Sequence, residues 1–439
     1  MEIYILGLVA GVGLYMAWNI GANDVANSMA DAVGSKALTI KQAVILAGIC
    51  EFSGAVLVGG HVTDTIRKGI VAPSALATMP GMAEGQAAAL LVIGMAAALL
   101  AAAVWLHVAT LAGMPVSTTH SIVGAIAGFG ILAAGWSSVN WGKMGQIVAS
   151  WFISPFAGGL MAFLFFKFIS KRILAQEQPV KGALRHTPAI VFFLAGVVTL
   201  ATIYKGLTHV IKRFAWINDT STLLIALAMS ILSAIAFRQY LHYRLRDREN
   251  DPLPEQLEAV EAVYVPLVVI SSCAVAFAHG ANDVANAVGP LAAVAQIMKT
   301  GLVAMKVAVP FWILFLGGAG IVLGLATYGY RVMATVGTKI TEITPTRGVA
   351  ADIATTFTVL VCTRMKLPIS TTHTLVGAVM GVGLARGLAG LNKKIINKII
   401  KSWLITVPAA AAICIVFFIL GRYFLLDTVR EMVLAARRG

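Results

Sequence analysis

Charged residues are scarce in this sequence, and this scarcity excludes most classes of soluble protein. Asp, Glu, Lys and Arg make up 12% of the 439 residues, whereas a soluble domain has about 25%. Hydrophobic residues supply 59%, against about 45–50% in average proteins. This composition rules out a disordered chain, a coiled coil and an ordinary cytosolic enzyme. It is typical of an all-α, polytopic membrane protein.

Acidic residues are fewer than basic ones, 19 against 33, which gives a formal net charge of +14. No long basic run exists, and the basic residues lie between hydrophobic stretches. We therefore interpret the excess as charge in cytoplasmic loops, and not as a surface for nucleic acid. The expected partner is a lipid bilayer, and the expected location is the cell (inner or plasma) membrane, which the chain crosses several times.

Motifs of common enzymes are missing as well. The chain has no GxxxxGK[ST] loop for ATP, no GxSxG and no HExxH motif. No enzyme activity and no cofactor are therefore expected, and any transport would run on an ion gradient or downhill. The cysteines lie singly in apolar stretches, so we interpret them as buried residues and not as disulfides or metal ligands. They are Cys50, Cys273, Cys362 and Cys414.

Hydrophobic segments are what the sequence does have. A spanning helix needs about 20 mostly apolar residues, and we predict twelve transmembrane or re-entrant helices. Three of them are candidates for re-entrant segments: two are glycine-rich and begin with polar residues (117–135 and 370–388), and one is short and acidic (349–363). The twelve segments are 3–23, 40–60, 86–112, 117–135, 145–168, 188–204, 220–240, 260–282, 301–328, 349–363, 370–388 and 399–425.

Two motifs occur twice in the chain. Gly-Ala-Asn-Asp-Val-Ala-Asn, here called GANDVAN, stands at 21–27 and again at 280–286. PVSTTHSIVGAIAGFG at 115–130 is matched by PISTTHTLVGAVMGVG at 368–383. Long motifs in the same order and at similar spacing indicate that the chain consists of two related halves.

The repeat predicts the domain organisation. We assign residues 1–165 to a first repeat, 166–259 to linking segments with two extra helices, and 260–439 to a second repeat. An odd number of predicted segments separates the GANDVAN motifs, so the second repeat is expected to be inverted relative to the first. Inverted repeats are typical of transporters, which bind their substrate near the bilayer midplane where the repeats meet.

The serine and threonine motifs suit an anion. Pro115 ends the preceding helix, and Ser117 is a good N-cap for the helix that follows. Thr118 and Thr119 then lie in the first turn, where backbone N–H groups have no intrahelical partner and the helix dipole favours negative charge. Such a site suits phosphate, although a pair of ordinary helix caps is the structural alternative. The second copy repeats the arrangement with Ser370, Thr371 and Thr372 after Pro368.

The GANDVAN motifs suit a cation. Asn23 and Asn27 share a helix face, and carboxylate, amide and backbone carbonyl oxygens are hard ligands that suit Na⁺. Gly21 is expected to let the backbone unwind and present its carbonyl groups. Polar contacts that hold neighbouring helices together are the structural alternative. The predicted sodium-binding residues are Asn23, Asp24, Asn27, Asn282, Asp283 and Asn286.

Other ionisable residues fall inside or near the segments. Glu51 and Asp352 lie within apolar segments, so they are candidates for coupling or gating carboxylates, with helix bridging as the alternative. His120 and His373 follow the two serine-threonine runs and are expected to hydrogen-bond in the first turn of each helix.

The repeat also has an asymmetry. His279 precedes the second GANDVAN motif but Ile20 precedes the first, which argues against a paired role for the histidine. Asp31 and Asp64 are expected at the membrane interface because they lie near segment ends.

The doubled motifs resemble those of the inorganic phosphate transporter (PiT) family. GANDVAN at 21–27 and 280–286, with P-[VI]-STTH at 115–120 and 368–373, carries the resemblance, which covers essentially the whole chain. It implies a secondary symporter of inorganic phosphate coupled to Na⁺ or H⁺, with inverted repeats and about twelve spans. By similarity, the GANDVAN residues would bind substrate or coupling ion and the serine-threonine runs would hold phosphate. Glu51 and Asp352 would match carboxylates that are important in eukaryotic relatives.

We therefore expect a symporter that imports inorganic phosphate with Na⁺ by alternating access. Uptake of phosphate or a metal–phosphate complex with H⁺ is the alternative within the same class. An intramembrane metal-dependent hydrolase that uses Asp24, Asp283, His120 and His373 is an alternative of another class, and a passive anion channel is a third. A homodimer is expected on general grounds.

Overall fold

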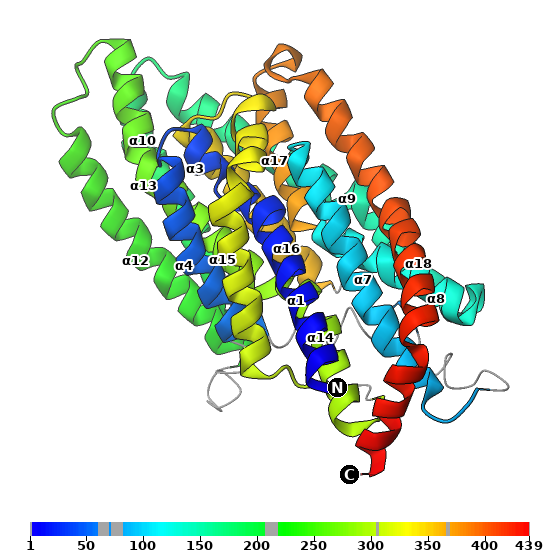
Figure 1. Ribbon diagram of the computed structural model, residues 1–439. Coiled ribbons are helices and arrows are strands. Elements are labelled where there is room, and N and C mark those ends of the chain that lie inside the picture. The colour runs from blue at the N-terminus through cyan, green and yellow to red at the C-terminus, as the bar shows by residue number, and fades with distance from the viewer. Residues whose placement is uncertain are drawn as a thin grey trace.

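The computed structural model describes residues 2–59, 70–71, 82–206, 218–303, 307–365 and 369–438. These residues are almost entirely helical, and their one β feature is an isolated bridge between Val71 and Val139. Long tilted helices form a single bundle, and both termini lie at its lower end in Figure 1. The prediction of an all-α protein is confirmed.

The helices before the linking segments are α1 (Glu2–Ile20), α2 (Ala26–Ser28), α3 (Ala30–Gly34), α4 (Ile40–Val58), α7 (Gln86–Leu111), α8 (Thr118–Ala134) and α9 (Trp141–Ile169). The linking segments contain α10 (Pro179–Ala201) and α12 (Asp219–Leu245). The remaining helices are α13 (Leu253–Asp283), α14 (Ala285–Thr300), α15 (Phe311–Ala334), α16 (Pro345–Arg364), α17 (Thr371–Ala385) and α18 (Lys393–Arg438). Short 3₁₀ or π-helical turns, η1 (Gly21–Val25) among them, interrupt or extend several of these helices.

Each of the twelve predicted segments overlaps one of these helices, although 301–328 begins ten residues before α15, and α14 was not predicted. Nine of the described helices are long and apolar enough to cross a membrane, so twelve full crossings are not confirmed. The three predicted segments outside those nine became α8, α16 and α17, the candidates for re-entrant segments. The helices α8 and α17 have only 17 and 15 residues, while about 20 residues are needed to span a bilayer.

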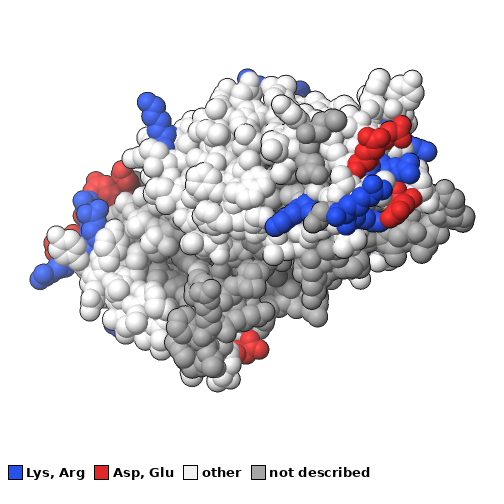
Figure 2. All heavy atoms as spheres, turned by 60° about the horizontal axis from the view of Figure 1, so that its bottom comes forward, with Lys and Arg blue, Asp and Glu red and all other residues white. Residues whose placement is uncertain are grey.

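The outside of the bundle suits lipid. Leu57, Phe156, Leu232 and Phe424 are among many large apolar side chains that are exposed on the described helices. In the view of Figure 2, Lys, Arg, Asp and Glu gather near the margins of the molecule, and uncharged residues cover most of the described surface between them. An exposed apolar surface of this extent is expected of a protein embedded in a bilayer.

The motif-bearing helices of each predicted repeat pack against helices of the other repeat. The helix α8, which begins at the first serine-threonine run, packs on α18, and α17, which begins at the second run, packs on α9. In the same reciprocal way, the first GANDVAN turn packs on α15, and α13, which carries the second GANDVAN motif, packs on α4. The two halves therefore hold each other's motif-bearing helices, while their inverted orientation remains a prediction.

Glycines allow two of these contacts. A Cβ atom at Gly324 of α15 would lie 2.9 Å from the backbone nitrogen of Ala22 and closer still to the Trp18 carbonyl group. At Gly280 a Cβ atom would lie 2.8 Å from the Cα atom of Glu51. Helices approach this closely only where one of them has no side chain.

We expect Gly324→Ala to destabilise the bundle by about 1–3 kcal/mol or more, because the added methyl group has no room beside α1. The measurement is the apparent melting temperature of the purified protein, followed by fluorescence-detected gel filtration. Gly11→Ala is the matched control, since no atom lies within 4 Å of a Cβ atom placed there. Equal melting temperatures for the two variants would contradict the close contact between α1 and α15.

Candidate ion and anion site

The first GANDVAN motif forms a buried turn directly after α1. Gly21–Val25 is a π-helical turn, and all five residues are buried. The expected unwinding of the backbone at Gly21 is therefore wrong, because the chain stays helical there. The physical reason for glycine is contact with α15: a Cβ atom would lie 2.9 Å from the Cα atom of Ile321. Single π turns are frequent at functional sites in helical proteins.

The serine-threonine runs start two short buried helices, as predicted. The Ser117 hydroxyl accepts a hydrogen bond of 3.2 Å from the backbone N–H of His120, and Ser370 accepts one of the same length from His373. Both serines are therefore N-caps. Pro115 precedes the first helix, while Pro368 lies outside the described residues.

Each GANDVAN aspartate reaches the serine-threonine run of its own half. The Thr118 hydroxyl donates to Asp24 Oδ2 over 2.8 Å, and the Thr371 hydroxyl donates to Asp283 Oδ2 over 3.1 Å. These four residues occupy equivalent positions of the two repeats, so the same contact is made twice. Each contact places a carboxylate beside a helix N-terminus, where backbone N–H groups and the dipole favour negative charge.

Contacts between the two halves bring the first and the second serine-threonine run together. Asn286, from the second half, donates to the hydroxyls of Thr118 and Thr119 over 3.1 and 3.3 Å. The rings of His120 and His373 meet with their centroids 4.7 Å apart. The N-terminal ends of α8 and α17 thus come together, and most of the predicted phosphate and sodium residues lie around this meeting point.

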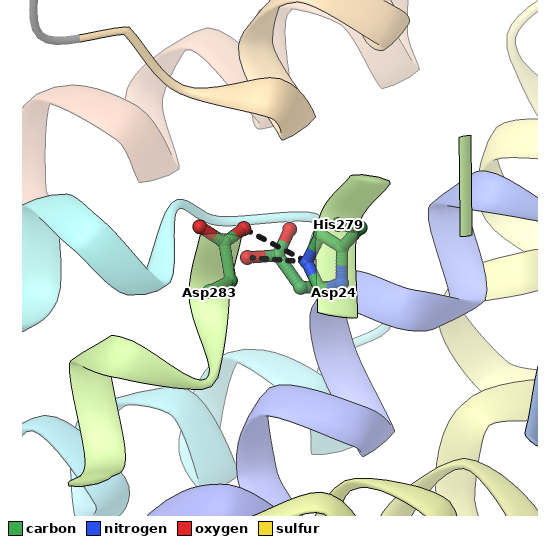
Figure 3. A group of neighbouring side chains, drawn as sticks. All are labelled: Asp24, His279 and Asp283. Atoms are coloured by element: carbon green, nitrogen blue, oxygen red, sulfur yellow. Dashed lines mark ion pairs between the residues drawn. The ribbon is translucent and has the colours of Figure 1, made fainter. Parts of the chain in front are cut away.

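His279 lies between three carboxylates. Its Nδ1 is 3.0 Å from both oxygens of Glu51. Its Nε2 is 2.9 Å from Asp283 Oδ2 and 3.7 Å from Asp24 Oδ2. Figure 3 shows the two aspartates, one from η1 and one from the end of α13, directed at the same imidazole ring. All four side chains are almost fully buried.

This central position of His279 was not predicted. The comparison of the repeats argued against a paired role, because Ile20 stands at the equivalent position, but the one histidine lies beside both GANDVAN aspartates. The same comparison gave no sign that one histidine would serve both aspartates. A signal was present in the sequence nevertheless, because a single ionisable residue inside an otherwise repeated apolar segment is by itself a functional hypothesis.

The predicted asparagines differ in their surroundings. Asn23 is fully hydrogen-bonded: its amide donates to Thr110 and to the Met114 carbonyl, and its Oδ1 accepts from the Val116 N–H, over 2.9–3.0 Å. It therefore fastens the loop that leads to Ser117. By contrast, Oδ1 of Asn27 and Oδ1 of Asn286 are buried and have no partner among the described residues.

The remaining hydroxyls and amides lie at the edge of the cluster. Thr372 Oγ1 is buried without a partner in the described part of the chain. Asn282 is half-buried and donates to Asp283 Oδ1 over 3.2 Å. Asn27 donates weakly, over 3.4 Å, to Asp24 Oδ1 and to the Asn23 carbonyl. Unpartnered buried oxygens are costly, so they indicate places where an ion, a water molecule or a substrate completes the hydrogen bonding.

The two predicted coupling carboxylates are not neighbours in the hydrogen-bond network. Glu51 belongs to the His279 cluster, whereas Asp352 accepts hydrogen bonds from Ser271 and Ser272 over 2.6 and 2.8 Å. Asp31 was expected at the interface, but its side chain is fully buried. The expectation failed because α3 follows the GANDVAN turn into the bundle instead of leaving it. Asp64 lies outside the described residues.

The chemistry of the cluster is that of a combined cation and anion site. One ligand atom from each of Asp24, His279 and Asp283 lies within 4.8 Å of the others, which is close enough for all three to hold one cation. The N-terminal ends of α8 and α17 supply N–H and O–H donors for an anion at the same place. An anion cannot approach the two carboxylates unless positive charge lies between them.

Comparisons with known proteins agree with this chemistry. The model of the "Phosphate transporter family" matches residues 20–414. A protein of Thermococcus kodakarensis, named "Putative phosphate permease", is 48% identical over 93% of this chain and 95% of its own length. An Arabidopsis thaliana protein named "Inorganic phosphate transporter 2-1, chloroplastic" is 42% identical over 92% of this chain and 70% of its own length. A solved structure described as "The sodium-dependent phosphate transporter" is 40% identical, with a TM-score of 0.82 over 96% of this chain and 100% of that chain.

Proposed function

Because this chain belongs to the phosphate transporter family and is a multi-pass membrane protein, we propose that it imports inorganic phosphate together with Na⁺. The proposed site is the cluster at the N-terminal ends of α8 and α17. The proposed mechanism is alternating access, in which the two halves rock about this site and open it to one side of the membrane at a time.

A single arrangement carries the proposal: Asp24 and Asp283 stand at the two helix N-termini that would hold phosphate. Phosphate and two carboxylates repel one another strongly in a buried site of low dielectric constant. Cations between them remove this repulsion, and oxygen ligands of this kind suit Na⁺. Neither phosphate nor Na⁺ then binds well alone, which is the physical basis of coupled transport.

We propose the following roles in binding for these residues. The hydroxyls and first-turn N–H groups of both serine-threonine runs bind phosphate. Carboxylate and amide oxygens of the GANDVAN motifs bind Na⁺, and Asn23 contributes mainly by holding the loop before α8. The phosphate-binding set is Ser117, Thr118, Thr119, Ser370, Thr371 and Thr372, and the sodium-binding set is Asp24, Asn27, Asn282, Asp283 and Asn286, with Asn23 in support.

The test is uptake of radiolabelled phosphate into proteoliposomes that contain the purified protein. One set receives an inward Na⁺ gradient, and the other receives an inward H⁺ gradient in buffers without Na⁺. We expect phosphate to accumulate above equilibrium with Na⁺ only. Accumulation with H⁺ only would keep the phosphate site but replace Na⁺ coupling with proton coupling, for which the contact between His279 and Glu51 offers a route. Equilibration without accumulation would indicate a channel.

A further inference from the structure

A second pair of carboxyl groups, Asp31 and Asp352, lies apart from the His279 cluster. Asp31 is on α3 and Asp352 is on α16, and the exposed fraction of each side chain is 0%. The helices α3 and α16 pack on each other, and the two carboxyl groups are neighbours within hydrogen-bonding reach. Gly348, one turn before Asp352, brings the helices together: a Cβ atom there would lie 3.3 Å from the Cβ atom of Asp31. Neither carboxyl group pairs with His279 in the described structure.

The hydrogen bonds of this pair are incomplete. Ser271 and Ser272 of α13 both donate to Oδ2 of Asp352, over 2.6 and 2.8 Å. Apart from the contact between the two carboxyl groups, Oδ1 of Asp352 and both oxygens of Asp31 have no hydrogen-bond partner among the described residues. The serines fix one oxygen of Asp352, so its other oxygen and those of Asp31 are the atoms available to a cation or a shared proton.

Positive charge is also missing from the pair. Within the described ranges, no lysine, arginine or histidine forms an ion pair with Asp31 or with Asp352. Two adjacent buried carboxylates without a counter-charge are not a stable arrangement, because each loses its hydration and repels the other. A cation or a proton must therefore complete the pair.

We propose that Asp31 and Asp352 hold a Na⁺ ion at a site separate from the phosphate site. Three carboxylate oxygens that receive no hydrogen bond from any other described residue come from two helices in contact. An all-oxygen set of this kind suits a hard cation and not a softer transition metal. In the described part of the chain, no histidine pairs with these two carboxyl groups, which distinguishes this site from the cluster around His279. The inference deepens the proposed function, because it rests on Na⁺ as the coupling ion.

The helices that carry Asp31 and Asp352 are also connected along the chain to the phosphate site. The helix α3 follows directly from the first GANDVAN turn, α13 leads into the second GANDVAN motif, and α16 leads toward the second serine-threonine run. A cation between α3 and α16 would therefore hold together two helices that are adjacent in sequence to the proposed phosphate site. Loss of this ion is expected to weaken phosphate uptake without removing any ligand of phosphate.

The test is direct binding of ²²Na⁺ to the purified protein in detergent, by equilibrium dialysis without phosphate. We expect Asp31→Asn to bind one Na⁺ fewer per chain than the wild type at saturation, and Asp352→Asn to do the same. Asp427→Asn, a change of the same charge on the exposed side of α18, is the matched control and should bind the wild-type number. Gel filtration identifies variants that fail to fold, and either member of the pair suffices for the test.

Wild-type Na⁺ binding in folded Asp31→Asn or Asp352→Asn protein would overturn the inference and indicate that a shared proton completes the pair. The same measurement on Asp24→Asn separates this inference from the proposed function. If Asp24→Asn loses an ion but Asp31→Asn does not, only the second site is wrong. If Asp31→Asn loses an ion but phosphate uptake needs no Na⁺, the second site stands and the proposed coupling is wrong.

Discussion

Asp283→Asn and, separately, Asp24→Asn are expected to abolish Na⁺-coupled phosphate uptake while the protein remains folded. Each substitution keeps the shape of the side chain but removes one negative charge from the proposed cation site. Each also weakens the charged hydrogen bond to Thr371 or Thr118. A hydrogen bond to a charged group contributes about 1.5–3 kcal/mol to stability, so its weakening also loosens the contact between each aspartate and the serine-threonine run.

The measurement is initial uptake in proteoliposomes under an inward Na⁺ gradient, with the amount of folded protein fixed by gel filtration. Asp251→Asn is a suitable control, because the ion pair that Asp251 makes in the described structure is with Arg248, in the connection between α12 and α13. Asp283 lies closer to His279 than Asp24 does, 2.9 against 3.7 Å, so Asp283→Asn should lower the melting temperature more. Wild-type uptake by either variant would exclude its aspartate from the transport site.

Local signals in the sequence were sufficient for the helices. Segments of about 20 apolar residues predicted α4, α7 and α12 closely, because a membrane-spanning helix is specified by its own composition. The helix α14 was missed because it continues the GANDVAN motif of α13 with Asn286 and Pro290, which resemble the start of a loop. Proline is tolerated there because neighbouring helices surround it.

The serine-threonine runs were interpreted correctly as N-caps for the same reason. Capping is a local interaction, and Ser117 and Ser370 make the same bond to the residue three positions later. The role of Asn23 was beyond such reasoning. Its three partners lie some 90 positions away along the chain, so the sequence gives no indication that its amide is already occupied.

Long-range contacts between ionisable residues were equally hidden. Glu51 and His279 are separated by 228 positions, and Asp31 meets Asp352 from the opposite half of the chain. Glu51 and Asp352 are recognisable as unusual by themselves, because a buried charge in a membrane protein is costly. Asp31 was expected at the interface, and His279 was not expected to have a paired role. Only the packing of α4 on α13 and of α3 on α16 determines which of them are partners.

His279→Gln is expected to lower both stability and uptake strongly, and Glu51→Gln in the same chain should restore stability. A carboxylate oxygen lies within 3.0 Å of each ring nitrogen of His279. This arrangement fits the doubly protonated ring, which offsets part of the negative charge of Glu51, Asp24 and Asp283. Removal of one partner from a buried ion pair costs about 3–5 kcal/mol, since the other charge is left uncompensated.

The double variant separates an electrostatic role of His279 from a purely steric one. With Glu51 neutral, the loss of the imidazole no longer leaves that buried charge unpaired, so the melting temperature of Glu51→Gln/His279→Gln should exceed that of His279→Gln alone. Uptake should stay low in both, because Asp24 and Asp283 still lack the side chain between them. Additive losses of stability in the double variant would mean that His279 acts by packing. Wild-type stability and uptake in His279→Gln would show that Asp24 and Asp283 do not depend on His279.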